Sequence, residues 1–127
     1  MANNNRPTSP HLQIYRLPLT AKMSISHRAT GALLSAGLAL TVLLLMALAS
    51  GPSSWETVHN ILRSGFGQVV LFGFTLVLNY HLCNGIRHLF WDIGHGYDLQ
   101  AASRANKLVL AATLVLTALV WLAALSV

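Results

Sequence analysis

The sequence is short of charged residues and has a single cysteine. Charged residues make up only 9% of its 127 positions, against about 25% in a soluble domain. A chain this poor in charge cannot cover a globular surface, and 54% of its residues are hydrophobic. Cys83 has no second cysteine with which to form an intrachain disulfide or a Cys-x-x-Cys metal site. These absences favour a membrane protein, and the length favours one domain.

Three long apolar segments are present, at about residues 29–49, 66–91 and 108–127. Each is long enough to cross a hydrocarbon core of about 30 Å as a helix that rises 1.5 Å per residue. A soluble bundle of three buried helices would need polar faces, which the first and third segments lack. The sequence therefore predicts an all-α membrane protein with three transmembrane helices, and the intervening "SGPSSWETVHN" is expected to be a short polar loop.

The N-terminal segment "MANNNRPTSPHLQIYRLPLTAK" is polar and contains Pro7, Pro10 and Pro18, which favour extended or turn structure. It has neither the apolar core of a signal peptide nor the Arg/Ser pattern of a transit peptide. We expect residues 1–22 to form a cytoplasmic arm and residues 23–127 to form the membrane anchor domain. Since the chain starts at Met without a transit peptide, we favour a bacterial inner membrane over the mitochondrial inner membrane.

The net charge of +5 predicts how the chain is oriented. No basic block or aromatic–basic alternation supports binding to nucleic acid. By the positive-inside rule, the N-terminus and the loop between the second and third spans face the cytoplasm or matrix, and the C-terminus faces the other side. The loop between the first two spans offers only Arg63, whereas the inner side carries Arg6, Arg16, Lys22, Arg28, Arg87, Arg104 and Lys107.

The segment "NYHLCNGIRHLFWDIGHG", residues 79–96, is apolar enough for a bilayer yet carries several ionisable residues. Such groups are costly in hydrocarbon and usually mark a functional site. Successive residues of an α-helix are rotated by about 100° around its axis. Five residues of this segment are therefore predicted to lie in one stripe along the helix, within an arc of roughly 80°. Within it, Gly85 leaves a gap one turn from His81, as a flat, bulky cofactor would require. The stripe consists of His81, Gly85, His88, Asp92 and His95.

His81 lies deepest and has no acidic residue near it in sequence, so it is predicted to be a haem ligand or a proton-relay group. We interpret His88 and His95 as residues of the membrane interface. We interpret Arg87 as an anchor whose charged end reaches the membrane surface. Asp92 fits an ion-pair partner for Arg87 or His88. The predicted topology brings this cluster and the pair His27 and Arg28 to the same inner half of the membrane.

Two blocks, "RPTSPHLQIYRLPLTAKMSISHRATG" and "YHLCNGIRHLFWDIGHG", resemble the signature blocks of the cytochrome b subunit of succinate dehydrogenase, respiratory complex II. The shared pattern is S-P-H-L-x-x-Y, then S-I-x-H-R-x-T-G, then H-x-x-x-G-x-R-H-L-x-W-D. The resemblance covers essentially the whole chain. The sequence of the second block is closer to the mitochondrial and alphaproteobacterial branch of the family than to the enterobacterial branch.

The resemblance implies a membrane anchor that forms a helical bundle with a second small membrane subunit. Together they would hold a flavoprotein and an iron–sulfur subunit, and electrons from succinate would pass to ubiquinone. One haem b would lie between the two membrane subunits, with one histidine from each. The chain itself has no flavin-binding fingerprint and no cysteine cluster, so the chemistry on succinate is expected on other subunits.

For the site residues, His81 is expected to bind the haem iron axially through a neutral imidazole nitrogen. His88 lies about 10 Å further along the same helix, too far to reach the opposite face of one iron. The second ligand is therefore expected from another helix, which in the family belongs to the partner subunit, and His27 is a weaker candidate. The haem propionates are expected near Arg28, then His27, then His88.

The quinone site is expected at "SISHR". Ser24 and Arg28 fall on one helix face if a helix begins near Thr20, which sets a hydroxyl beside a permanent positive charge. His27 is a third candidate for contact with the quinone. Without the resemblance, Ser24 fits a helix cap and Arg28 an interfacial anchor. Two other functions stay open, a haem-free structural anchor and a small transporter subunit, although the broken spans of a transporter are not evident.

Overall fold

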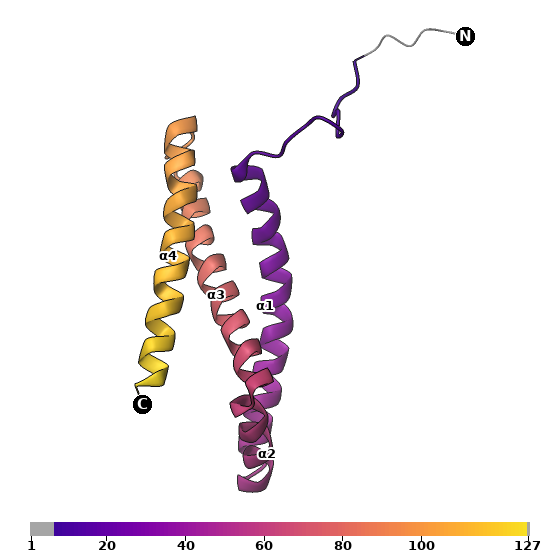
Figure 1. Cartoon of the computed structure of the whole chain (residues 1–127), viewed down its shortest axis with the longest axis vertical. Helices are drawn as coiled ribbons and strands as arrows, with labels where there is room; N and C mark the ends of the chain where they lie inside the picture. Colours follow the sequence, from indigo (N-terminus) through magenta and orange to yellow (C-terminus); the bar gives the residue numbers. More distant parts are fainter. Residues whose placement is uncertain (1–6, 127) are drawn as a thin grey trace, which may run out of the picture.

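The computed structural model describes residues 7–126, and this part of the chain forms four α-helices and no strand. They are α1 (Leu19–Ala49), α2 (Pro52–Arg63), α3 (Gly65–Asp92) and α4 (Leu99–Leu125). Helices α1, α3 and α4 are long and apolar enough to cross a membrane, which confirms the predicted fold class. They run along the long axis of the molecule, and α2 lies at the end away from the N-terminus (Figure 1).

Helix α1 begins well before its uninterrupted apolar stretch. Pro18 stands at the N-cap in an extended conformation, and the helix starts at Leu19, close to the onset at Thr20 on which the predicted quinone face depends. Its 31 residues span about 46 Å, more than the roughly 30 Å of a hydrocarbon core. The excess length carries the polar residues from Ser24 to Arg28, near the N-terminal end of α1.

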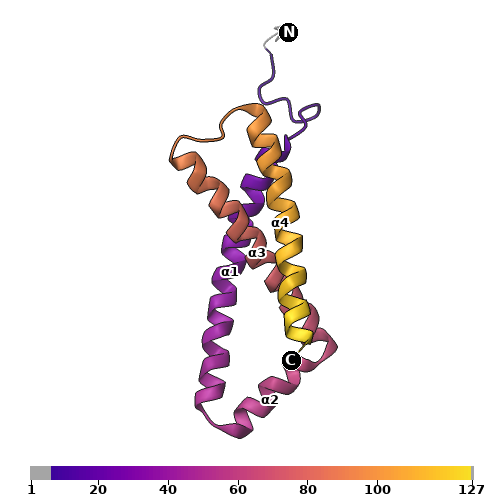
Figure 2. The same cartoon turned by 90° about the vertical axis from the view of Figure 1, so that its left-hand side faces the viewer.

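The expected polar loop between the first two spans is instead the helix α2, so that prediction is wrong. Gly51 turns the chain with φ 106°, which favours glycine, and Pro52 occupies the first turn, where its missing N–H costs nothing. Ser64 then ends α2, and its hydroxyl accepts a hydrogen bond from Gly67 N–H at 3.2 Å as α3 begins. Helix α2 runs obliquely from α1 to α3 across this end (Figure 2).

Helix α3 ends at Asp92, before the end of the predicted polar stripe. Gly94 and Gly96 both have φ 83° and turn the chain toward α4, whose start is capped by the Asp98 side chain at 2.8 Å from Ala101 N–H. His95 therefore lies in the connecting loop and does not continue the helical face of His81. The predicted stripe holds as far as Asp92 and fails at His95.

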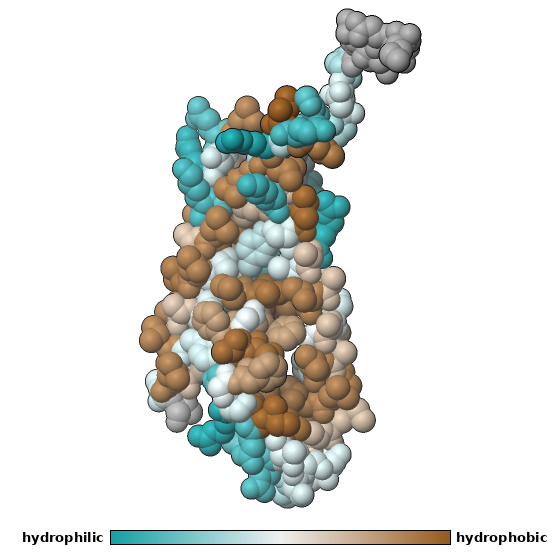
Figure 3. All heavy atoms as spheres, turned by 45° about the vertical axis from the view of Figure 1, so that its right-hand side comes forward, coloured by the Kyte–Doolittle hydropathy of each residue, from teal (hydrophilic) through white to brown (hydrophobic). Residues whose placement is uncertain are grey.

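The interior of the bundle is polar rather than apolar. Only Met23, Cys83 and Val109 are buried hydrophobic residues in the described chain, while large apolar side chains cover the outer surface as a broad band with polar ends (Figure 3). This inverted pattern is expected where lipid is the solvent and hydrogen bonds join the helices. The buried polar residues are Asn79, Asn84, Arg87, Asn106, Thr113 and Thr117.

Candidate functional site

Three histidines from two helices meet at the end of the bundle where α1 begins and α3 ends. The rings of His27 on α1 and His81 on α3 are stacked, with centroids 4.0 Å apart and planes inclined by 16°. His88, two turns further along α3, has its ring centroid 5.1 Å from that of His27. The predicted convergence of the two sequence blocks is therefore present in the fold.

Helix α1 holds the His81 ring at two points. The hydroxyl of Thr30 lies 3.0 Å from His81 Nδ1 and donates a hydrogen bond of 2.8 Å to the backbone carbonyl of His27. The next residue, Gly31, faces the ring edge so closely that a Cβ there would lie 3.2 Å from His81 Cε1. The close approach of the α1 backbone thus requires a small residue at Gly31 and fixes the position of the imidazole.

The space beside the histidines is partly open. A Cβ added at Gly85 would meet only His27 Cε1, at 3.8 Å, so the predicted gap one turn from His81 is present. His27 Nδ1 is buried and has no hydrogen-bond partner among the described residues. Buried polar atoms in proteins are nearly always hydrogen-bonded, so this nitrogen is available to a further partner such as a water molecule or a bound group.

The stacked arrangement bears on the second axial ligand. A ring nitrogen binds a metal along its own ring plane, so two imidazoles stacked 4.0 Å apart cannot bind opposite sides of one iron. The described residues hold no group of three or more His, Cys, Asp or Glu side chains that could bind a metal ion by themselves. The stacking argues against His27 as the second ligand of an iron held by His81.

Ser24 and Arg28 lie on α1 beside the histidine cluster. The Arg28 guanidinium Nε donates a hydrogen bond of 3.5 Å to the Ser24 backbone carbonyl, and the arginine side chain is exposed. The Ser24 side chain is half-buried, and none of the side-chain hydrogen bonds among the described residues uses its hydroxyl. The two side chains therefore share a face, as the spacing predicted, with a hydroxyl and a cation available to a ligand.

Arg87 is buried between the helices, so its interpretation as an exposed interfacial anchor is wrong. It is 4% exposed, hydrogen-bonds through Nη1 to Asn106 Oδ1, and lies with Cζ 4.4 Å from the centre of the Trp91 ring. Asn106 in turn donates to the Thr20 hydroxyl at 2.8 Å, which joins α3, α4 and α1. No ion pair forms among the described residues, so the expected partnership of Asp92 with Arg87 or His88 is also absent.

The polar network around Arg87 was missed because its partners are far apart in sequence. Asn84 donates to the Met23 carbonyl at 3.2 Å, and Tyr80 and Ser26 share a hydrogen bond of 2.6 Å between α3 and α1. A helical spacing of small polar residues on α3 and α4 is the signal that could have found it. These positions are Asn79, Asn84, Asn106, Thr113 and Thr117.

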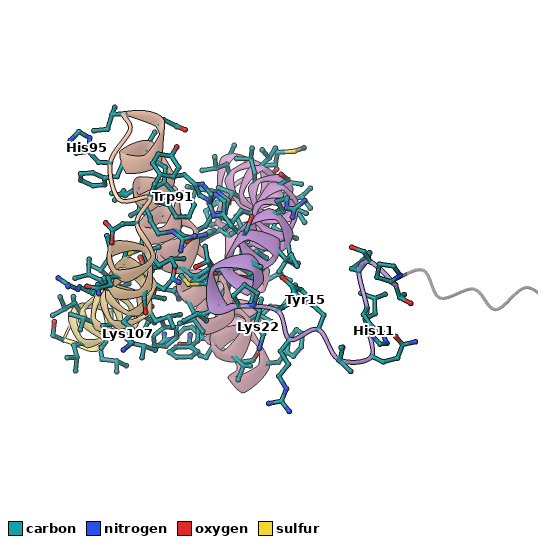
Figure 4. All side chains as sticks on the ribbon, turned by 90° about the horizontal axis from the view of Figure 1, so that it is seen from above. His11, Tyr15, Lys22, Trp91, His95 and Lys107 are labelled. Atoms are coloured by element: carbon teal, nitrogen blue, oxygen red, sulfur yellow. The ribbon has the colours of Figure 1, made fainter. Side chains whose placement is uncertain are left out.

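His95 and the N-terminal arm lie outside this cluster. Seen from the end where α1 begins, His95 is at the outer edge of the α3–α4 connection, whereas Trp91 lies on the side toward α1 (Figure 4). His95 Nδ1 lies 3.0 Å from the Ile93 carbonyl, a local contact within the loop. His11 and Tyr15 are on the arm, away from the helices (Figure 4). The histidines that converge are therefore His27, His81 and His88.

The fold and the cluster define a small helical membrane protein with paired histidines at one end of its bundle. Residues 2–120 match the family described as succinate dehydrogenase/fumarate reductase transmembrane subunit. The chain therefore belongs to this family of membrane anchor subunits.

Its curated relatives include bacterial and mitochondrial proteins. The chain is 42% identical over 115 residues to the succinate dehydrogenase cytochrome b556 subunit of Paracoccus denitrificans, covering 91% of this chain and 88% of that protein. It is 38% identical over 119 residues to the subunit of the same name from Rickettsia typhi, covering 93% and 92%. With the mitochondrial cytochrome b560 subunit of Sus scrofa, identity is 40% over 115 residues, covering 87% of this chain and 66% of that protein.

Proposed function

We propose that this chain is the membrane-anchoring cytochrome b subunit of a succinate:quinone oxidoreductase, that it binds haem b and that it contributes to the ubiquinone site. The observation that best supports this proposal is the placement of His81, whose ring is held by Thr30, lies closely against Gly31 and has a gap one turn away at Gly85. The relatives are named as cytochrome b subunits of succinate dehydrogenase, which supports the same function.

A haem b fits the residues at this end of the bundle. When bound, it would accept and release one electron at a time. The imidazole of His81 would bind its iron, and the gap at Gly85 would admit its flat face. The haem propionates would lie at the end of the bundle that holds Arg28, His27 and His88. Cations there would lower the free-energy cost of burying the propionate carboxylates. The second axial histidine would come from the partner membrane subunit, which the stacking of His27 on His81 supports.

Ubiquinone would bind on the neighbouring face of α1. A quinone head group needs hydrogen-bond donors at its carbonyl oxygens within a mostly apolar pocket. The Ser24 hydroxyl is available to donate to one carbonyl, and the Arg28 guanidinium would stabilise negative charge that develops on that oxygen. His27 is a third candidate, and other donors, including a tyrosine, would come from partner subunits.

The assembly would consist of this chain, a second small membrane subunit, an iron–sulfur subunit and a flavoprotein subunit. Succinate would be oxidised on the flavoprotein, and this chain would receive electrons by way of the iron–sulfur subunit. The exposed apolar surfaces of the three spans would contact lipid and the second membrane subunit. We propose a bacterial inner membrane as the location, with the N-terminus in the cytoplasm.

The proposal is tested by the colour of the purified complex. His81→Leu should abolish or grossly change the b-type band in a reduced-minus-oxidised spectrum, because the iron loses an axial ligand. His95→Leu is the matched control, since His95 lies in the loop beyond α3 and should leave the band unchanged. An unchanged band in His81→Leu would overturn the assignment and favour a haem-free anchor.

A further inference from the structure

The hydroxyl of Thr30 lies between the backbone carbonyl oxygen of His27 and the ring nitrogen Nδ1 of His81. It lies 2.8 Å from the His27 backbone carbonyl oxygen and 3.0 Å from His81 Nδ1. A carbonyl oxygen only accepts hydrogen bonds, and 2.8 Å is the usual distance for a bond in which a hydroxyl donates to oxygen. The single proton of the hydroxyl therefore lies toward His27.

The remaining contact fixes the proton on the imidazole. Since the Thr30 hydroxyl has given its only proton to the carbonyl, its oxygen is left to accept. The 3.0 Å contact with His81 Nδ1 is a hydrogen bond only if that nitrogen carries the proton. In a neutral imidazole the other nitrogen, Nε2, then has the free lone pair.

We propose that Thr30 is a positioning residue that holds His81 in the tautomer with the proton on Nδ1, so that Nε2 is the atom that binds the haem iron. This inference rests on the proposed function, because it concerns the same ligand. Nε2 forms no side-chain hydrogen bond within the described part of the chain, so nothing there competes for its lone pair. Gly31 supports the arrangement because its lack of a side chain lets the ring lie against α1.

The contact should also adjust the electronic properties of the ligand. An acceptor at Nδ1–H raises the basicity of the imidazole, and a more basic axial ligand favours the oxidised iron. The acceptor belongs to α1, the helix that also carries Ser24 and Arg28. The hydroxyl therefore links the proposed haem ligand on α3 to the helix of the proposed quinone face.

Three variants of the assembled complex test this role, with the midpoint potential of the haem as the principal measurement. Thr30→Val keeps the shape and removes the acceptor, so the potential should become more positive. Thr30→Ser keeps the hydroxyl and should hold the potential near that of the wild type. Thr41→Val is the matched control, because the Thr41 hydroxyl also donates to a carbonyl of α1, that of Gly37 at 2.9 Å, but has no imidazole partner.

A second measurement is the low-spin electron paramagnetic resonance signal of the oxidised haem, which reports on axial ligand strength and orientation. It should change in Thr30→Val and not in Thr30→Ser or Thr41→Val. A wild-type potential and signal in Thr30→Val would overturn the proposal. If Thr30→Val does not bind haem, the result for Thr30→Ser tests the role of the hydroxyl. Haem binding with the wild-type potential in Thr30→Ser supports that role. Loss of the haem in Thr30→Ser as well overturns it.

These outcomes are distinct from a failure of the proposed function. If the b-type band survives His81→Leu, His81 is not the ligand and the proposed haem site itself is wrong. If His81→Leu abolishes the band but Thr30→Val leaves the potential and signal unchanged, the haem site stands and only the role of Thr30 fails.

Discussion

The side chains of Ser24 and Arg28 share one face of α1 but are held differently. Arg28 contacts the backbone of the preceding turn and extends outward, while the Ser24 hydroxyl is half-buried and uncommitted. A donor and a cation one turn apart form a small polar patch on α1. Such a patch is suited to a quinone carbonyl, which is neutral when it binds and gains negative charge as it is reduced.

Removal of this patch should affect the quinone reaction alone. Ser24→Ala and Arg28→Leu should each lower succinate oxidation coupled to quinone, by about tenfold or more if one hydrogen bond to a charged group is lost. Succinate oxidation coupled to an artificial dye should be retained, because electrons then leave the complex before they reach this chain. Assembly is checked first by co-purification of the other subunits. If both reactions proceed at wild-type rates in both variants, these residues do not form the site.

At the residue scale, the sequence located the histidine cluster but not the environment of Arg87. His27, His81 and His88 could be placed together because helical phase and membrane depth depend only on local spacing. The partner of Arg87 is Asn106 on another helix, and its burial depends on how α3 packs on α4. That packing is a tertiary property, so a charge near a helix end was misinterpreted as an anchor.

At the scale of the elements, the three spans were predictable and α2 was not. Long apolar segments have one stable structure in lipid, so their composition was enough. In the segment that became α2, Gly51, Pro52 and several polar residues favoured a turn, yet proline is also well accommodated at the first position of a helix. Its half-buried apolar residues, Trp55, Val58 and Leu62, recur at helical spacing, which was the signal for a short amphipathic helix.

The packing of α1 against α3 depends on Gly37. A Cβ at that position would lie 2.6 Å from Phe74 Cε1, which is closer than Cβ atoms come to a neighbour, so the ring or a helix must move. Gly37→Ala should therefore separate the helices or displace Phe74, at a cost of about 1–3 kcal/mol in the stability of the assembled complex. The measurement is the temperature at which the complex dissociates in detergent, which should fall.

Gly73→Ala is the matched control for this effect. Gly73 lies within α3, one residue from Phe74, and a Cβ there would have no atom within 4 Å. Both substitutions gain the same helix propensity of about 1 kcal/mol, so only the clash distinguishes them. Equal dissociation temperatures for the two variants would show that α1 and α3 do not pack through Gly37 and Phe74.

On the scale of the whole molecule, polar groups line the interior and apolar side chains cover the outside. The surface is largely apolar, with Leu99 90% exposed and Phe66 76% exposed. Such a surface is suited to contact with lipid or with the apolar face of another helix.

The orientation of the chain is the final prediction. Residues before α1 and the connection from α3 to α4 lie at one end of the bundle, and α2 lies at the other (Figures 1 and 2). Since positive charge favours the inner side, Ser9→Cys and Ser103→Cys should react with a membrane-impermeant maleimide only after cells are opened, whereas Ser53→Cys should react in intact cells. Each labelled position is exposed, and Cys83, the native cysteine, is buried, so the wild type is the unlabelled control. Labelling after detergent solubilisation checks that each new cysteine is reachable, and reaction of Ser9→Cys in intact cells would reverse the topology.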